Sequence, residues 1–222
     1  SRGHHEVATP SEELLMQVTL AIKRFNPESE QSQPYFQEFT LDVEEHFTVL
    51  DSLIKVREEV DESLALRCSC RASICGSCAM RINGHAGLAC KTQASSALTD
   101  GNTIVIEPAG VMPVVKDLVV DFSLFWDKIR EVVPYLQPQG DEPEAEYIAS
   151  NESMLHLSSV TACIMCGSCV SDCTVMEVDP TFLGPAAWAK AYRFTADPRD
   201  GDEKGVSQER LEQLVEPTGM WD

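Results

Sequence analysis

Residues 70–78 read Cys-Arg-Ala-Ser-Ile-Cys-Gly-Ser-Cys, and a fourth cysteine follows at position 90. This spacing is the plant-type [2Fe–2S] pattern, in which a loop wraps three thiolates around the cluster and a more distant cysteine closes it. Small residues at Gly76 and Ser77 let backbone N–H groups approach the sulfurs and stabilise the reduced cluster. The sequence therefore predicts a [2Fe–2S] cluster with four ligands: Cys70, Cys75, Cys78 and Cys90.

A zinc site and buried unliganded cysteines are the alternative interpretations of this stretch. Zinc favours paired Cys-x2–4-Cys knuckles, whereas this loop has one long and one short gap. Cys68 lies outside the pattern, and we expect it to be a small buried or half-buried thiol rather than a ligand.

A second group of cysteines follows the spacing Cys-x2-Cys-x2-Cys-x3-Cys at residues 163–173. In this bacterial ferredoxin run, the first three cysteines bind one cluster and the fourth binds a different one. No cysteine follows Cys173, so the count leaves ligands missing. Either Cys173 closes a single four-thiolate cluster, or further ligands lie beyond Asp222, in which case the C-terminus is truncated.

Composition narrows the classes of protein to be considered. The nine cysteines fall in two short stretches, which fits ligand sets in a reducing compartment better than a disulfide framework. A net charge of −19 argues against nucleic acid or an anionic membrane surface as a direct partner. No apolar run reaches the roughly 20 residues that span a bilayer, so direct membrane insertion is not expected.

The first part of the chain has the pattern of a mixed sheet. Alternating residues predict an antiparallel pair of strands around residues 18–23 and 39–43, and Thr48 is placed to cap a following helix. Asn83-Gly84 predicts a type I′ hairpin, and residues 104–106 predict a last strand. These elements indicate an α+β fold.

The periodicity changes near Pro113. Seven apolar residues at helical spacing predict one helix of about five turns that packs against the core: Val115, Leu118, Val119, Phe122, Trp126, Ile129 and Val133. Further helices are expected around Ser153–Ala162, Pro185–Ala196 and Ser207–Val215. We therefore expect a mixed domain over residues 1–114 and a helical domain over residues 115–222.

Several stretches together resemble the iron–sulfur subunit of the succinate dehydrogenase and fumarate reductase family, the family of respiratory complex II. They are residues 70–80, 82–84, 88–90 and 163–169, Gly184-Pro185-Ala186, Tyr192-Arg193-Phe194 and Asp197-Pro198-Arg199-Asp200. The similarity runs from about Val18 to the last residue and retains the order of both cysteine groups.

The resemblance implies an N-terminal β-grasp [2Fe–2S] ferredoxin-type domain followed by an all-α helical ferredoxin domain. By position, Cys163, Cys166 and Cys169 would give three ligands to a [4Fe–4S] cluster, and Cys173 would give one ligand to a [3Fe–4S] cluster. The family's remaining ligands follow a Gly-x-Trp stretch such as residues 219–221, so we expect a further cysteine segment beyond the chain as given.

The resemblance also implies the function of an electron relay. Members pass single electrons between FAD in a flavoprotein partner and quinone in a membrane-anchor partner. The chain would then lie on the cytoplasmic face of a bacterial inner membrane, or on the matrix face of a mitochondrial one, attached through anchor subunits. It shows no flavin fingerprint and no dicarboxylate site, so we expect no catalytic residue in it and no activity from it alone.

Three rival interpretations remain at this point. The chain would be an iron–sulfur subunit of another flavoprotein complex, a freestanding ferredoxin-type carrier, or a zinc-stabilised structural protein. The long acidic region after residue 115 favours a docked subunit over a freestanding carrier.

Overall fold

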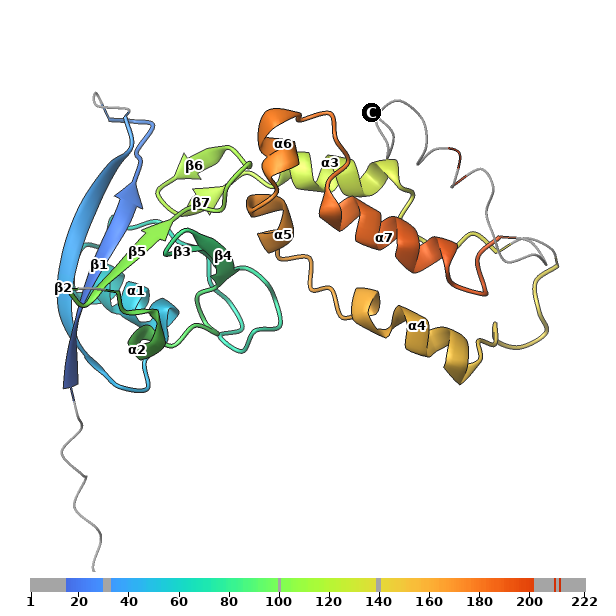
Figure 1. The fold of residues 1–222 in the computed structure, drawn as a ribbon, viewed down its shortest axis with the longest axis horizontal. Helices are drawn as coiled ribbons and strands as arrows, with labels where there is room; N and C mark the ends of the chain where they lie inside the picture. The colour runs from blue at the N-terminus through green and yellow to red at the C-terminus, as the bar shows by residue number, and fades with distance from the viewer. Residues whose placement is uncertain are drawn as a thin grey trace, which may run out of the picture.

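A computed structural model describes residues 15–29, 33–99, 101–138 and 141–201, together with residues 210 and 212. A sheet with two short helices lies at one end of the molecule, and a group of helices lies at the other (Figure 1). A small hairpin, made of β6 (Val114–Lys116) and β7 (Val119–Val120), lies between them. The described chain is thus an α+β structure with the helices gathered after the sheet.

The sheet has five strands in the order β2-β1-β5-β3-β4. Strands β1 (Leu15–Arg24) and β2 (Tyr35–Glu44) pair antiparallel, as the sequence predicts. Strand β5 (Thr103–Glu107) lies parallel to β1 and antiparallel to β3 (Ala79–Ile82). Because β1 and β5 lie inside the sheet, their inward residues Val18, Leu20, Ile22, Ile104 and Ile106 are all fully buried.

The sheet is covered by α1 (Val49–Lys55), which continues into a wider helical turn, η1 (Val56–Val60). Thr48 begins α1 with a capping box, since its side chain accepts the Asp51 N–H and the Asp51 side chain accepts the Thr48 N–H. Leu50, Leu53 and Ile54 pack into the sheet's core. The predicted cap and the buried face of this helix are therefore confirmed.

The predicted hairpin is also confirmed. Strand β3 turns into β4 (His85–Leu88) through Asn83 and Gly84, which have φ values of 50° and 81°. Two central residues with positive φ define a type I′ turn, whose twist matches that of the paired strands. A short helix, α2 (Ala94–Ala97), follows before β5.

The predicted five-turn helix over residues 115–133 is wrong. Its first part forms the β6–β7 hairpin, and only α3 (Ser123–Glu131) is helical. Of the residues expected to form a buried stripe, Val115 is 48% exposed and Trp126 is 40% exposed. The apolar spacing was coincidental, because paired β-branched valines on either side of a turn also form strands.

Asp117 explains why the chain turns there. Its backbone has a φ of 47°, and its buried carboxylate accepts hydrogen bonds from Arg24 Nε at 3.0 Å, Phe25 N at 3.0 Å and Ala65 N at 2.9 Å. The predicted domain border between residues 114 and 115 falls within β6. Beyond it, Leu118 packs in the sheet's core and Val120 packs among the helices.

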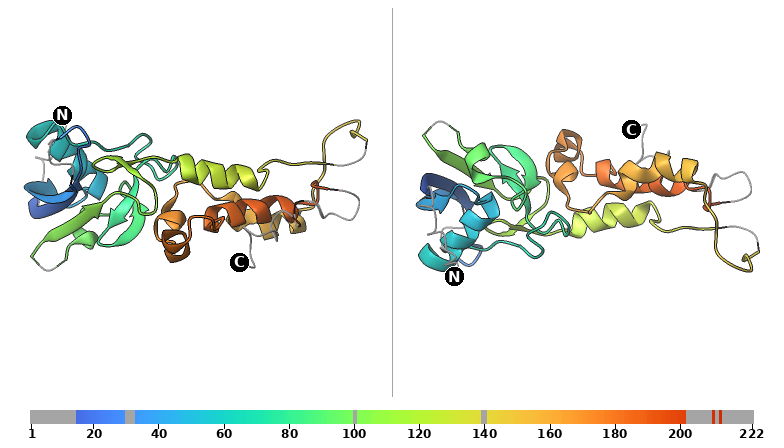
Figure 2. Two further views of the ribbon diagram at one scale, coloured as in Figure 1. Left: turned by 90° about the horizontal axis from the view of Figure 1, so that it is seen from above. Right: turned by 90° about the horizontal axis from the view of Figure 1, so that it is seen from below.

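The helical part contains α4 (Asn151–Thr161), α5 (Ser168–Ser171), α6 (Thr174–Val178) and α7 (Pro185–Thr195) in addition to α3. Seen from above and from below, α3 and α7 lie side by side (Figure 2). The helices predicted around residues 153–162 and 185–196 correspond to α4 and α7. The helix predicted over residues 207–215 lies almost wholly outside the described residues.

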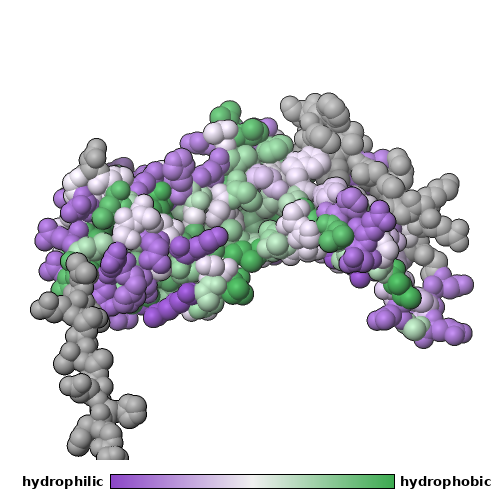
Figure 3. Space-filling view, turned by 60° about the horizontal axis from the view of Figure 1, so that its bottom comes forward, coloured by the Kyte–Doolittle hydropathy of each residue, from purple (hydrophilic) through white to green (hydrophobic). Residues whose placement is uncertain are grey.

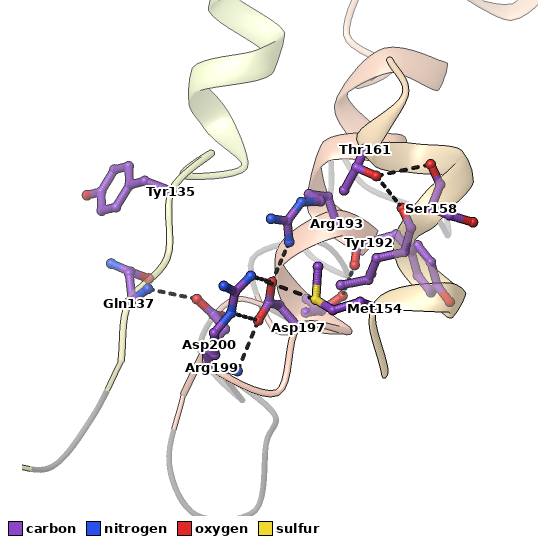
Figure 4. Close-up of polar contacts among 12 residues, drawn as sticks. Tyr135, Gln137, Met154, Ser158, Thr161, Tyr192, Arg193, Asp197, Arg199 and Asp200 are labelled. Atoms are coloured by element: carbon purple, nitrogen blue, oxygen red, sulfur yellow. Dashed lines mark hydrogen bonds and ion pairs between the residues drawn. The ribbon is translucent and has the colours of Figure 1, made fainter. Parts of the chain in front are cut away.

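The segment after α7 is held by a buried carboxylate. Asp197, which is fully buried, accepts hydrogen bonds from Arg193 Nη1 at 2.5 Å and from Arg199 Nε and Nη2 at 2.8 and 2.7 Å (Figure 4). Asp200 accepts the backbone N–H of Gln137, which joins this segment to the chain after α3. The tyrosine–arginine and aspartate–arginine stretches that were noted in the sequence therefore stabilise the end of the helical part.

Among the described residues, none of the helices combines the length and the apolar character needed to cross a bilayer.

Candidate iron–sulfur centres

The first cysteine set consists of Cys70, Cys75, Cys78 and Cys90, and the structure brings all four into one loop region. Cys70 and Cys75 exchange N–H···S hydrogen bonds at 3.5 and 3.3 Å. Cys90 N donates to Cys78 Sγ at 3.5 Å, and Ser73 Oγ lies 3.8 Å from Cys90 Sγ. These contacts join Cys70 to Cys75, Cys78 to Cys90 and Ser73 to Cys90 within residues 70–90.

Backbone N–H groups gather on one sulfur of this set. Cys70 Sγ accepts from Ala72, Ile74 and Cys75, each at 3.3 Å. The loop achieves this by placing Arg71 and Ser73 at positive φ, 53° and 59°, so that successive N–H groups point inward. Such donors stabilise negative charge on a thiolate, which is the form that binds iron.

The thiols of the first set differ in their protonation. A hydrogen bond from the Ser77 hydroxyl, reinforced by backbone N–H groups, lowers the pKa of exposed Cys75 to about 6. Burial raises the pKa of Cys78 to about 11. Cys75 is therefore already a thiolate near neutral pH, whereas ligation at Cys78 must displace a proton.

The donor set suits a cluster better than a single ion. Zinc favours paired Cys-x2–4-Cys knuckles, whereas this loop has one long and one short gap. In a [2Fe–2S] cluster each iron takes only two protein thiolates, so the sulfurs lie farther apart. Four cysteines in one loop, with N–H groups aimed at sulfur, fit that group.

The second cysteine set consists of Cys163, Cys166 and Cys169, and it surrounds the start of α5. Gly167 begins this helix with a φ of 79°, and Met165 has a φ of 58°. The Cys169 residue is exposed overall, yet partial desolvation of its sulfur and the charges of Cys166 and Cys163 raise its thiol pKa. Cys166 and Cys169 both flank the turn at Gly167, and Cys163 precedes Cys166 by three residues.

Cys173 and Cys68 lie outside the two sets as the spacing defines them. Cys173 precedes α6 and packs, half-buried, among the apolar side chains of the helical part. Cys68 is half-buried against the sheet's core, as expected of a thiol that is not a ligand.

The sequence analysis missed two features of these centres. The hydroxyls of Ser73 and Ser77 contact sulfurs directly, although only the small size of Ser77 was considered. Gly76 is buried against Cys166 of the second set, where an added Cβ would lie 2.8 Å from Cys166 Cβ. The Ser77 contact is visible in the Cys-x-Ser spacing. The Gly76–Cys166 contact joins residues 90 positions apart and has no sequence signal.

The surface between the two parts of the molecule is more apolar than its ends. In the space-filling view, hydrophobic residues gather over the middle, and hydrophilic residues cover both the sheet end and the far helical end (Figure 3). The first cysteine loop also exposes an apolar side chain, since Ile74 is 69% exposed.

Comparisons with known proteins agree with this geometry. The family described as a 2Fe-2S iron-sulfur cluster binding domain matches residues 19–127. A succinate dehydrogenase iron-sulfur subunit of Coxiella burnetii is 38% identical over 207 residues, which cover 92% of this chain and 84% of that protein. A fumarate reductase iron-sulfur subunit of Mycobacterium tuberculosis is 35% identical over 210 residues, covering 94% of this chain and 82% of that protein.

A solved structure shows the same fold. A chain of the Mycobacterium smegmatis Sdh1 complex in the apo form superposes with a TM-score of 0.77 at 27% identity, covering 89% of this chain and 82% of that one. The arrangement of sheet and helices is therefore shared with that chain.

Proposed function

Because this chain belongs to the family of succinate dehydrogenase and fumarate reductase iron–sulfur subunits, we propose that it relays single electrons between a flavoprotein subunit and membrane quinone. It acts as an electron-transfer subunit of an oxidoreductase complex and has no catalytic residue of its own. The observation that carries this proposal is the set of three backbone N–H groups on Cys70 Sγ, in a loop that also holds three further thiols.

The first cysteine set is the site of the [2Fe–2S] cluster. When bound, the cluster supplies a one-electron couple. The chain holds the extra negative charge of the reduced state by hydrogen bonds to the sulfurs, from the backbone at Cys70 and from the Ser77 hydroxyl at Cys75. Burial of Cys78 and Cys90 keeps water from that side of the loop.

The second cysteine set supplies three ligands of a [4Fe–4S] cluster, and Cys173 supplies one ligand of a [3Fe–4S] cluster. Support comes from the spacing of Cys163, Cys166 and Cys169 around the start of α5 and from the place of Cys173 before α6. This division follows the ferredoxin run, in which the fourth cysteine belongs to a different cluster.

Two domains would organise the relay: a β-grasp ferredoxin-type domain over residues 1–114 and a helical ferredoxin domain over residues 115–222. Two apolar cores support a division into two parts, although Ala109 and Met112 pack in the helical core and Leu118 packs in the sheet's core. The first would face the FAD-containing subunit, and the second would face the membrane-anchor subunits that hold the chain at the cytoplasmic or matrix face of the membrane.

Electron paramagnetic resonance, with iron and sulfide analysis of anaerobically purified complex, tests the proposal. Dithionite should produce a [2Fe–2S] signal, and succinate should produce it only when the flavoprotein subunit is present. Zinc in place of iron would overturn the redox function, and reduction by succinate without the flavoprotein subunit would overturn the relay.

A further inference from the structure

The two cysteine sets touch through main-chain atoms. Gly76 lies between the cysteines of the first set and is buried against Cys166 of the second set. A Cβ added at Gly76 would lie 2.8 Å from Cys166 Cβ, 2.9 Å from Cys166 Cα and 3.3 Å from Cys166 N. Since these are backbone and Cβ atoms, no rotation of a flexible side chain can relieve such a clash.

A second glycine makes a similar contact nearby. A Cβ at Gly110 would lie 2.5 Å from the Ser171 carbonyl oxygen, and the Gly110 N–H donates to Ser171 Oγ at 2.8 Å. Ser171 is the last residue of α5, the helix that follows Gly167 in the second set. Gly76 and Gly110 therefore allow close approach at two points, to Cys166 of the second set and to Ser171 at the end of α5.

A carboxylate fastens the same junction. Asp172 Oδ2 accepts the backbone N–H of Ala86 at 2.7 Å, and Asp172 Oδ1 lies 3.3 Å from Arg81 Nε. Arg81 and Ala86 lie on β3 and β4, the hairpin that follows the first cysteine loop, and both strands contact α5 (Figure 1). We call the contacts made by Gly76, Gly110, Arg81, Ala86 and Asp172 the seam.

We propose that Gly76 and Gly110 are positioning residues that set the separation of the two cysteine sets, and that Asp172 fastens this separation. Electron transfer through protein weakens steeply as the gap widens, so the seam sets the rate of the crossing. With both clusters bound, a single electron would pass from the first to the second, with no bond made or broken and no proton moved. This inference rests on the proposed ligand sets.

The test compares Gly76→Ala with the unsubstituted protein in the assembled complex. With both clusters reduced, a paramagnetic neighbour speeds the spin relaxation of the [2Fe–2S] cluster and raises the microwave power needed to saturate its signal. Gly76→Ala should retain the g values of that signal but lose part of the enhancement, because the second set is pushed away.

Gly101→Ala is the matched control. Gly101 has a φ of 80°, close to the 72° of Gly76, yet nothing lies within 4 Å of a Cβ placed there. The control should saturate as the unsubstituted protein does. If both variants lose the enhancement equally, backbone strain explains the effect and the inference is wrong. It is also wrong if Gly76→Ala saturates like the unsubstituted protein.

Asp172→Asn decides the question if Gly76→Ala fails to assemble. It retains the shape of the side chain but weakens the contacts to Arg81 and Ala86, so the enhancement should fall. Asp127→Asn, at an exposed pair with Arg130 on α3, should leave it unchanged. An unaltered enhancement in Asp172→Asn overturns the inference.

The ligand proposal is judged separately, on the unsubstituted protein. Absence of a cluster from either set there would refute the ligand assignment. Two filled sets with an enhancement that ignores the seam would refute the seam alone.

Discussion

The tetrapeptide Cys-Gly-Ser-Cys occurs twice in this chain, at residues 75–78 and at residues 166–169. The local geometry is nearly the same, since Gly76 and Gly167 have φ values of 72° and 79°. Each serine hydroxyl also lies near the preceding cysteine, with Ser77 Oγ 3.2 Å from Cys75 Sγ and Ser168 Oγ 3.4 Å from Cys166 Sγ.

The surroundings of the two tetrapeptides differ. A side chain at Gly76 would strike the backbone of Cys166, whereas one at Gly167 would meet the Phe122 ring at 3.0 Å. The same four residues thus make the same turn. The absence of a side chain leaves room for Cys166 at Gly76 and for the Phe122 ring at Gly167. The tetrapeptide determines the turn, and its neighbours determine its use.

The largest expected effect tests whether the first tetrapeptide contributes ligands at all. Cys75→Ala should abolish the [2Fe–2S] signal completely, because the remaining three thiolates leave one iron short of a ligand. The measurement is electron paramagnetic resonance of the dithionite-reduced complex with iron analysis.

Cys68→Ala is the control for that loss. Cys68 packs half-buried against the sheet's core outside the loop, so the signal should persist. A signal that survives Cys75→Ala, or one that disappears in Cys68→Ala, would contradict the assignment of the first set.

The next effect concerns the segment after α7, in the same helical part as the second tetrapeptide. Hydrogen bonds from Arg199 and Arg193 hold the pKa of Asp197 well below its ordinary value of 3.8. A carboxyl whose pKa is lowered by folding contributes stability that is fully present above the pKa of the unfolded chain. That stability is lost as the pH falls from the unfolded pKa to the folded pKa. At pH 7, Asp197→Asn should therefore lower the free energy of unfolding by about 2 kcal/mol, and the difference should shrink below about pH 4.

Urea unfolding at several pH values, followed by the fluorescence of Trp126 and Trp188 in the helical part, measures this difference. Asp127→Asn, at an exposed ion pair, should change the free energy by less than about 0.5 kcal/mol at any pH. A constant difference between Asp197→Asn and the unsubstituted chain from pH 7 to pH 3 would show that the charge of Asp197 is unimportant.

A smaller quantity, a coupling free energy, separates the contact with the Phe122 ring from backbone strain at Gly167. Gly167→Ala should destabilise the protein by about 1–2 kcal/mol through its left-handed backbone, and by more through the Phe122 ring. Combining it with Phe122→Leu should recover about 1 kcal/mol as a coupling free energy in a double-mutant cycle.

The control cycle pairs Gly101→Ala with Phe122→Leu. Gly101 shares the backbone conformation without a neighbour, so its coupling to Phe122 should be close to zero. A Gly167–Phe122 coupling of zero would mean that the ring does not restrict this position.

The smallest expected effect compares the serines. Ser77→Ala removes a hydrogen bond to sulfur worth about 1 kcal/mol, which for a one-electron couple corresponds to roughly 40 mV. The reduced state carries more negative charge, so its loss of stabilisation should lower the [2Fe–2S] potential by that amount. Redox titration of the signal measures it.

Ser96→Ala serves as the control, because the Ser96 hydroxyl donates to the Gln93 carbonyl oxygen on α2 and not to a sulfur. Its potential should equal that of the unsubstituted protein. A higher potential in Ser77→Ala would reverse the assumed role of the hydroxyl.

Local signals predicted much of the sheet part correctly. Thr48 and Asp51 form a cap within four residues, and Asn83-Gly84 forms a two-residue turn, so each is decided by neighbours in the sequence. The ligand role of the first cysteine set rests on the same kind of local signal, its spacing, and stays a prediction.

Features that depend on distant residues were missed. Residues 115–120 satisfy helical spacing, but the turn at Asp117 is stabilised by Arg24, Phe25 and Ala65, which lie in other segments. The contact of Gly76 with Cys166 likewise depends on how the two parts of the molecule pack. Spacing can group ligands within a loop, but it carries no information on which loops meet.

The hydrogen bonds of Asp117 also bear on the order of events during synthesis. The end of β1 and the segment around Ala65, which leads into the first cysteine loop, are both fixed by a residue that leaves the ribosome later than all of them. The nascent chain can pair β1 with β2 early, but it cannot close the base of that loop until Asp117 has emerged. We therefore expect the segment that leads into the first cysteine loop to take its final position only after β6 has been translated.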